Sequence, residues 1–133
     1  MGILEDVLKE LDGALERVQI KREPYDLFIN EEDFPFSDGR TLMFLDGQFV
    51  LVDYQRGTLR NKKVFDKNDR KQLLYNLLKP ILISKASSQA SLSKDFYSQT
   101  FLENQFKLFS KISIEYALWR KQEISEILKR YPD

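Results

Sequence analysis

The sequence has 133 residues, of which 42% are hydrophobic and 32% charged, and its 21 basic and 21 acidic side chains give a net charge of zero. This is the size of one domain, and its 17 aromatic residues supply a core, so we expect residues 1–133 to form a single folded domain. The absence of Cys and His excludes disulfides, thiolate nucleophiles and the usual zinc clusters, and removes the commonest general base.

The first element expected is an amphipathic helix. Its apolar residues recur at steps of three and four, which is the period of one helical face: Leu4, Val7, Leu8, Leu11, Leu15 and Val18. Glu5 and Asp6 complement the helix dipole in its first turn. These acidic residues stand where a signal peptide would be basic, and no apolar run reaches the length of a membrane span. We therefore expect a cytoplasmic protein.

Residues 25–65 predict an antiparallel meander of three or four strands. Tyr25–Ile29, 41–45, 48–54 and 58–65 are the β-prone runs. Asp46-Gly47 separates two of these runs and indicates a tight hairpin, because a type I′ turn needs positive φ at both central residues. Arg56-Gly57 marks a further turn.

The remainder predicts three helices. N-cap candidates for the first helix are Asp66, Asn68 and Asp69, and Ser93 and Ser113 can cap the other two. Pro80 should kink the first of these helices, because it lacks a backbone N–H, and Pro132 should stop the last. The fold class expected is α+β, with an N-terminal helix, the meander, and three C-terminal helices on one face of the sheet.

Motifs for catalysis or cofactor binding are missing. The five glycines form neither a dinucleotide fingerprint nor a P-loop, and no serine elbow occurs. The run Glu31–Asp33 lacks the alternating spacing of a calcium loop. We therefore expect no catalytic, cofactor or metal site.

An acidic and aromatic loop is the candidate partner-binding segment; its residues are Glu31, Glu32, Asp33, Phe34, Phe36 and Asp38. One interpretation is a solvated loop whose phenylalanines are anchored in the core. The other is a protein-binding surface, in which carboxylates steer a basic partner and one aromatic ring anchors the contact. The sequence leaves both open.

The net charge of zero is unevenly distributed along the chain. Residues 1–60 carry 13 acidic and 7 basic side chains, for a net charge of −6, and residues 61–133 carry a net charge of +6. The basic residues are spread along helical patterns rather than gathered in a dense patch, so we expect no nucleic-acid partner.

The second half of the chain contains a set of short motifs: Gln55-Arg56-Gly57, Phe65-Asp66-Lys67, Phe101-x-x-x-Gln105-x-x-Leu108-Phe109, Arg120 and the closing Tyr131-Pro132. Together these motifs resemble the immunity protein 63 family of bacterial polymorphic-toxin systems. The resemblance covers residues 40–133. It implies a small cytosolic protein, encoded beside a secreted toxin, that binds the toxic C-terminal domain and blocks it. Its pattern positions are Gly57, Phe101, Gln105, Arg120, Tyr131 and Pro132.

The sequence is compatible with three functions. The first is a non-catalytic immunity protein that neutralises a cognate toxin domain by occlusion, as a monomer or weak homodimer, without cofactor, membrane or nucleic acid. The second is an adaptor or chaperone-like protein-binding module. The third is an enzyme that uses carboxylates or lysine as its acid and base groups.

Overall fold

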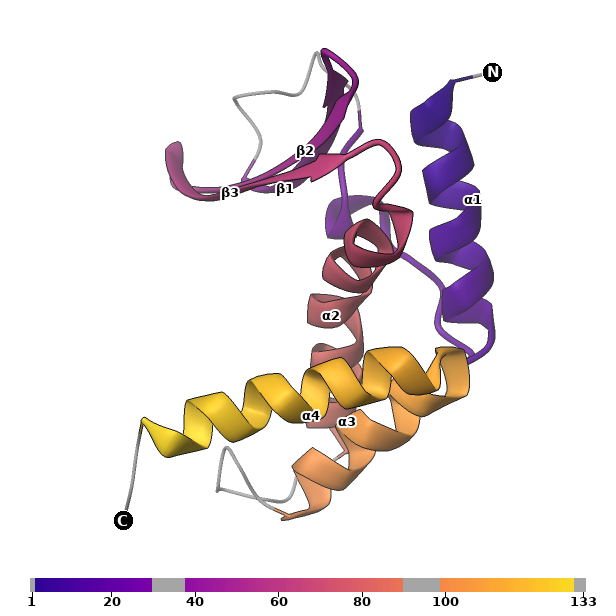
Figure 1. The fold of residues 1–133 in the computed structure, drawn as a ribbon, viewed down its shortest axis with the longest axis vertical. Coiled ribbons are helices and arrows are strands. Elements are labelled where there is room, and N and C mark those ends of the chain that lie inside the picture. The colour runs from indigo at the N-terminus through magenta and orange to yellow at the C-terminus, as the bar shows by residue number, and fades with distance from the viewer. Residues whose placement is uncertain (1, 30–37, 90–98, 131–133) are drawn as a thin grey trace. The chain divides into compact units, whose positions relative to one another are not determined.

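The computed structural model describes residues 2–29, 38–89 and 99–130, and its elements follow the predicted order (Figure 1). The helices are α1 (Ile3–Glu16), the short 3-10 helix η1 (Pro24–Asp26), α2 (Arg70–Gln89), α3 (Gln99–Ile112) and α4 (Ile114–Lys129). The strands are β1 (Gly39–Leu45), β2 (Gln48–Gln55) and β3 (Thr58–Asp66). This order confirms the α+β fold, with an N-terminal helix, a three-stranded meander and three C-terminal helices.

The chain forms two compact units. One comprises Met1–Glu16 and Ile20–Leu78, and therefore holds α1, the sheet and the first part of α2. The other comprises Arg17–Gln19 and Lys79–Asp133, and holds the rest of α2 with α3 and α4. Among the helices described here, none has the length and apolar character needed to cross a membrane.

The three strands are antiparallel in the order β1-β2-β3, and both connections are tight turns. Asp46 and Gly47 have φ of 51° and 78°, and Arg56 and Gly57 have φ of 53° and 74°. Positive φ at both central residues is the type I′ geometry that matches the twist of paired strands. The hairpin predicted at Asp46-Gly47 is confirmed.

The β-prone run Tyr25–Ile29 does not form a fourth strand. Pro24 begins the short helix η1, in which the Asp26 carboxylate accepts a hydrogen bond from the Glu23 N–H at 2.8 Å. This local capping bends the backbone and competes with strand pairing. Only Phe28 then reaches the sheet, in an isolated parallel bridge with Thr41 of β1.

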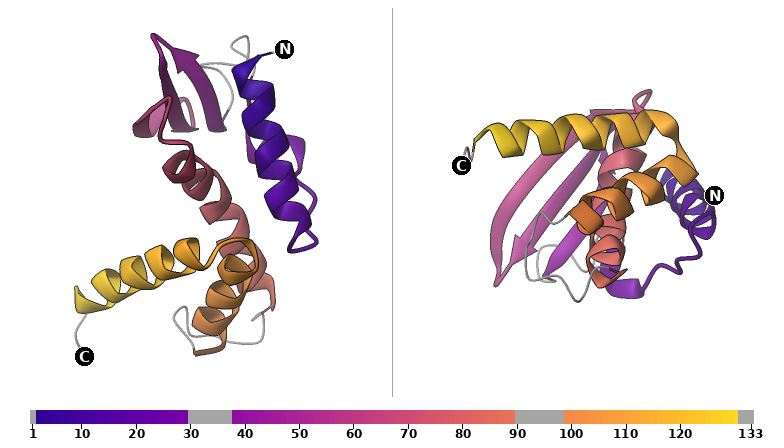
Figure 2. Two further views of the ribbon diagram at one scale, coloured as in Figure 1. Left: turned by 45° about the vertical axis from the view of Figure 1, so that its right-hand side comes forward. Right: turned by 90° about the horizontal axis from the view of Figure 1, so that it is seen from below.

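One face of the sheet carries the core of the first unit. The register places Leu42 opposite Leu51, and Phe49 between Phe44 and Phe65. The guanidinium of Arg70, in the first turn of α2, lies 5.7 Å from the centre of the Phe49 ring. The start of α2 therefore packs on this face, and α1 runs beside the sheet (Figure 2). The buried apolar residues that the helices of this unit contribute are Val7, Leu11, Leu15, Leu73, Tyr75, Leu77 and Leu78.

The helix α2 continues through Pro80, whose missing N–H leaves the carbonyl of Asn76 without its helical donor. Arg40, from β1, supplies the replacement: its guanidinium donates to the carbonyls of Asn76 at 3.1 Å and Leu77 at 3.0 Å. A further bond of 3.3 Å goes to the carbonyl of Asp26. One half-buried side chain thus satisfies three backbone acceptors.

In the second unit, α3 and α4 meet at a sharp corner. Ser113 is the N-cap of α4, as predicted, and its Oγ accepts a hydrogen bond from the N–H of Tyr116 at 3.4 Å. Arg17 donates to the carbonyl of Ile112, the last residue of α3, at 3.1 Å. The two helices then diverge from this corner (Figure 1). The N-cap predicted at Ser93 lies outside the described residues.

Candidate functional site

Most of the predicted acidic loop lies outside the described residues, so its role in partner binding stays a prediction; these residues are Glu31, Glu32, Asp33, Phe34 and Phe36. Asp38 is described and is exposed. Its carboxylate accepts a hydrogen bond from the N–H of Gly57 at 3.3 Å. The structure therefore gives Asp38 a local contact with the β2–β3 turn.

The residues that carry the family resemblance are partly brought together. Phe101 and Gln105 on α3 are buried, and so is Arg120 on α4. The Nε of Arg120 donates to the Oε1 of Gln105 at 2.7 Å. Gly57 lies in the other unit, at the β2–β3 turn, and Tyr131 and Pro132 lie outside the described residues.

Arg120 stands at the centre of a short polar network. Besides its bond to Gln105, it donates through Nη1 to the Oε1 of Glu123 at 3.3 Å, and the other carboxylate oxygen of Glu123 accepts from the Nζ of Lys79 at 2.9 Å. Hydrogen bonds with a charged partner in a partly buried setting are stronger than neutral ones. The network therefore fixes the rotamer of Arg120 and joins α2, α3 and α4.

Gln105 is left incompletely satisfied by this network. Its side chain is fully buried, and its Nε2 has no hydrogen-bond partner among the described residues. A buried amide donor without a partner lowers the free energy of unfolding. The stabilising contact of the Gln105 side chain is therefore the hydrogen bond that its Oε1 accepts from Arg120.

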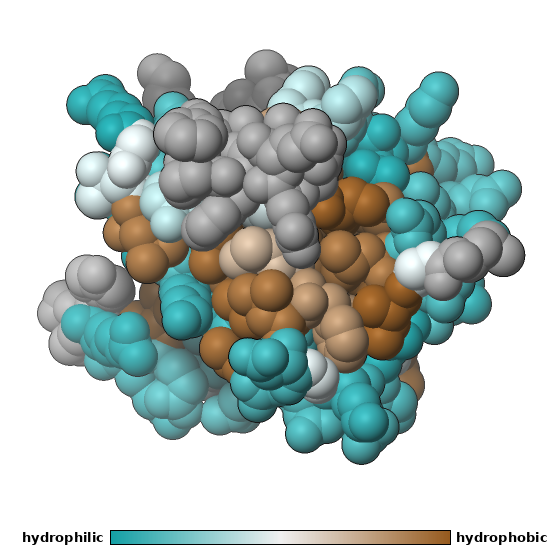
Figure 3. Space-filling model, turned by 90° about the horizontal axis from the view of Figure 1, so that it is seen from above, coloured by the Kyte–Doolittle hydropathy of each residue, from teal (hydrophilic) through white to brown (hydrophobic). Residues whose placement is uncertain are grey.

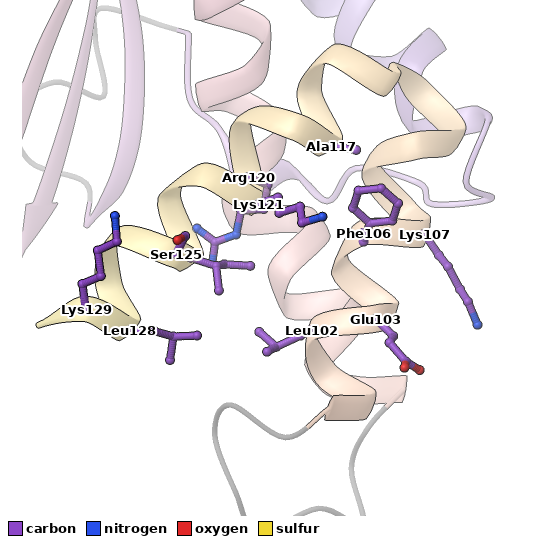
Figure 4. A pocket seen from close by; sticks show the side chains of 11 residues that line it. Leu102, Glu103, Phe106, Lys107, Ala117, Arg120, Lys121, Ser125, Leu128 and Lys129 are labelled. Atoms are coloured by element: carbon purple, nitrogen blue, oxygen red, sulfur yellow. The ribbon is translucent and has the colours of Figure 1, made fainter. Parts of the chain in front are cut away.

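A groove of about 710 Å³ opens between α3 and α4, with Arg120 in its wall (Figure 4). Its apolar lining residues are Leu102, Phe106, Ala117, Ile124 and Leu128, and its polar ones are Glu103, Lys107, Arg120, Lys121, Ser125 and Lys129. Leu102 and Leu128 point toward one another from the two helices (Figure 4). Phe106 and Leu128 are 39% and 43% exposed, so this apolar surface is open to solvent.

The charged residues that line the groove are mostly basic. Four of its lining residues are basic and one is acidic. Arg120 is engaged by Glu123, and Lys129 lies 3.6 Å from Glu126. Lys107 and Lys121, by contrast, have no carboxylate partner within the part of the chain that the structure describes. The arrangement suits an occupant that is apolar and negatively charged.

A second apolar cluster lies on the face of the sheet opposite Leu42 and Leu51. Met43, Val50 and Val52 form a buried cluster there, with Tyr54 packed against it. Val64, which the register places opposite Val50, is 48% exposed. Hydrophobic residues also gather at the centre of the surface seen from above, with hydrophilic residues around them (Figure 3).

The groove is not apparent from the sequence pattern. Leu102 and Phe106 are four residues apart, as are Ile124 and Leu128, and this spacing also marks residues that face a core. The spacing shows which side of a helix is apolar, but it does not show whether a neighbouring element fills that side. The sequence signal for the groove was the width of the apolar stripe on α3. Phe101, Gln105 and Leu108 already provide the buried face of this helix, so Leu102 and Phe106 widen the stripe beyond it.

The described residues contain no group of three or more acidic side chains placed to hold a metal ion. Comparisons with family models, curated proteins and solved structures found no match for this chain. The resemblance to the immunity protein 63 family therefore depends on the motif residues alone.

Proposed function

We propose that this protein is a non-catalytic immunity protein, which binds the toxic domain of a cognate secreted toxin in the cytoplasm and blocks it by occlusion. The observation that carries the proposal is the solvent-open apolar groove between α3 and α4, whose wall includes Arg120, one of the motif residues. Gln105, another motif residue, holds that arginine in place.

The composition of the groove is that of a protein-binding surface. Interfaces place exposed aromatic and aliphatic side chains at their centre and charged side chains at their rim. Here Phe106 and Leu128 are the exposed apolar anchors, and Lys121 is a rim charge. A few such anchors contribute most of the binding energy in typical complexes. The groove therefore supports binding to a protein more than chemistry on a small substrate.

Occlusion requires only a tight and specific complex. A protein that covers the active surface of a toxin needs no nucleophile, base or cofactor of its own, which accords with a sequence that has neither His nor Cys. The complex must outlast the exposure of the cell to toxin, so slow dissociation is the property under selection.

The test is co-expression of this protein with the toxin domain encoded beside its gene. We expect growth to be rescued and the two proteins to co-purify as a one-to-one complex. Co-purification without rescue would instead support the adaptor or chaperone-like function. Absence of both would refute the proposal.

A further inference from the structure

We infer that the α3–α4 groove binds an acidic amphipathic helix of the partner, with the apolar side chains of that helix seated between α3 and α4 and its carboxylates facing the lysines at the rim. The inference rests on the proposed function for the identity of the partner. The chemistry of the occupant follows from the groove itself.

The apolar floor requires apolar anchors. Leu102 and Phe106 come from α3, Leu128 comes from α4, and Leu102 and Leu128 point toward each other across the opening (Figure 4). A surface that reads phosphate would instead be lined with hydrogen-bond donors, so this lining favours an aliphatic or aromatic occupant. Side chains inserted here would remove Phe106 and Leu128 from water.

The rim charges select an acidic occupant. Lys107 and Lys121 lack carboxylate partners among the described residues, and Lys129 has only the exposed Glu126. Bringing a basic segment to this rim would place like charges together, which costs free energy in any interface. Glutamate or aspartate beside the apolar anchors would complete the pairs.

The length of the groove favours a helix over a single side chain or a small molecule. Along α4 its lining runs from Ala117 to Lys129, which is thirteen residues and about 18 Å of helix from the first to the last. That length matches three turns of a docking helix, whose anchors recur at i, i+4 and i+7. The helices α3 and α4 diverge from the corner at Ser113 (Figure 1), and we expect a third helix to dock in the groove between them, as it would in a helical bundle.

The experiment compares groove variants with matched variants on the same two helices. Leu128→Asp and Lys121→Glu change the groove. Leu118→Asp on α4 and Lys111→Glu on α3 make the same chemical changes at exposed positions outside it. Circular dichroism establishes that all four full-length variants remain folded, and the kinetics of binding to the toxin domain are then measured at two salt concentrations.

We expect Leu128→Asp to weaken the complex about 30-fold or more, mainly through faster dissociation, because it removes an anchor and places a charge on the apolar floor. Lys121→Glu should slow association several-fold at low salt and little at high salt. The two control variants should remain within about twofold of the wild type. If groove and control variants bind alike while the wild type still rescues growth, the inference is wrong and the proposed function stands.

A second measurement tests the groove without the toxin. Two labelled 16-residue helical peptides present leucines at i, i+4 and i+7, one with glutamates and one with lysines on its flanks. Fluorescence anisotropy should show saturable binding of the acidic peptide to the wild type, at least tenfold tighter than the basic peptide, and its loss in Leu128→Asp. Equal binding of the two peptides, or no binding of either, would contradict the inference. So would a wild-type dimer that Leu128→Asp converts to monomer, since a second copy would then occupy the groove.

Discussion

Replacing Arg40 by Met tests how the chain accommodates a proline inside α2. Methionine keeps most of the aliphatic length of arginine but removes the guanidinium, and with it the three hydrogen bonds to the carbonyls of Asp26, Asn76 and Leu77. Burial lowers the pKa of Arg40, while the carboxylates of Asp26 and Asp53 raise it. The group is cationic at neutral pH all the same, because an arginine guanidinium is not deprotonated in proteins.

The size of the effect follows from the acceptors that lose their donor. A hydrogen bond to a charged group contributes about 1.5–3 kcal/mol, and a buried acceptor left without a partner costs about 1–3 kcal/mol. The bond of 3.3 Å to Asp26 is the weakest of the three, and Asn76 is the acceptor that has no helical donor to fall back on. We therefore expect Arg40→Met to lower the free energy of unfolding by about 3 kcal/mol.

Pro80→Ala provides the decisive second variant. Alanine restores an N–H that can reach the carbonyl of Asn76, so the loss caused by Arg40→Met should shrink by about 1 kcal/mol in the Pro80→Ala background. Urea unfolding followed by circular dichroism measures the four proteins of this cycle, and Arg60→Met, at an exposed position of β3, is the control. A loss below about 0.5 kcal/mol in Arg40→Met, or no coupling to Pro80→Ala, would refute the reasoning.

Two further stability predictions follow from single contacts and turns. Arg120→Met should destabilise the protein by about 2 kcal/mol, because Gln105 then loses the donor to its buried oxygen. Gln105→Met should recover part of this loss in the double variant. Urea unfolding of the wild type, the two single variants and the double variant measures both effects. Substitution by alanine at Gly57 and at Gly13, where an added Cβ would meet no neighbouring atom, should change the free energy of unfolding in opposite directions in the same assay. Gly57→Ala should cost about 1 kcal/mol, because its φ is +74°, whereas Gly13→Ala, inside α1, should stabilise by up to about 1 kcal/mol. Equal effects at Gly57 and Gly13 would contradict this assignment.

The elements that the sequence predicted correctly are those whose causes are local. The turn at Asp46-Gly47 needs only a residue pair that tolerates positive φ, and the N-cap at Ser113 needs only a side-chain oxygen near the next turn. The sequence left open whether the run Tyr25–Ile29 adds a fourth strand. It does not, because its β-prone residues follow a proline and include an aspartate that caps the local backbone. Local capping outweighed strand propensity there.

The features on which the proposed function rests arise from contacts that sequence spacing does not show. Gln105 and Arg120 were noted as motif residues, but nothing in their separation of fifteen positions shows that they form a hydrogen bond. The role of Arg40 likewise appears only when β1 is placed against the interrupted helix. The groove depends on which neighbours α3 and α4 lack, and residue spacing does not show that. The partner-binding role of the acidic loop stays a prediction.

The acidic loop and the groove would attract partner surfaces of opposite charge, so charge variants can distinguish these two candidate interfaces. A loop with Glu31, Glu32 and Asp33 attracts a basic surface, whereas a groove edged by Lys107 and Lys121 attracts an acidic one. Exposed rim charges act chiefly on the association rate and are screened by salt. If the loop steers the toxin domain, the triple alanine variant of its three acids should slow association at low salt, and the charge reversal Lys121→Glu should leave it unchanged or faster. If the groove steers the toxin domain, Lys121→Glu should slow association at low salt, and the triple alanine variant should leave association unchanged or faster. A partner that carries both a basic cleft and an acidic helix would be slowed by either variant.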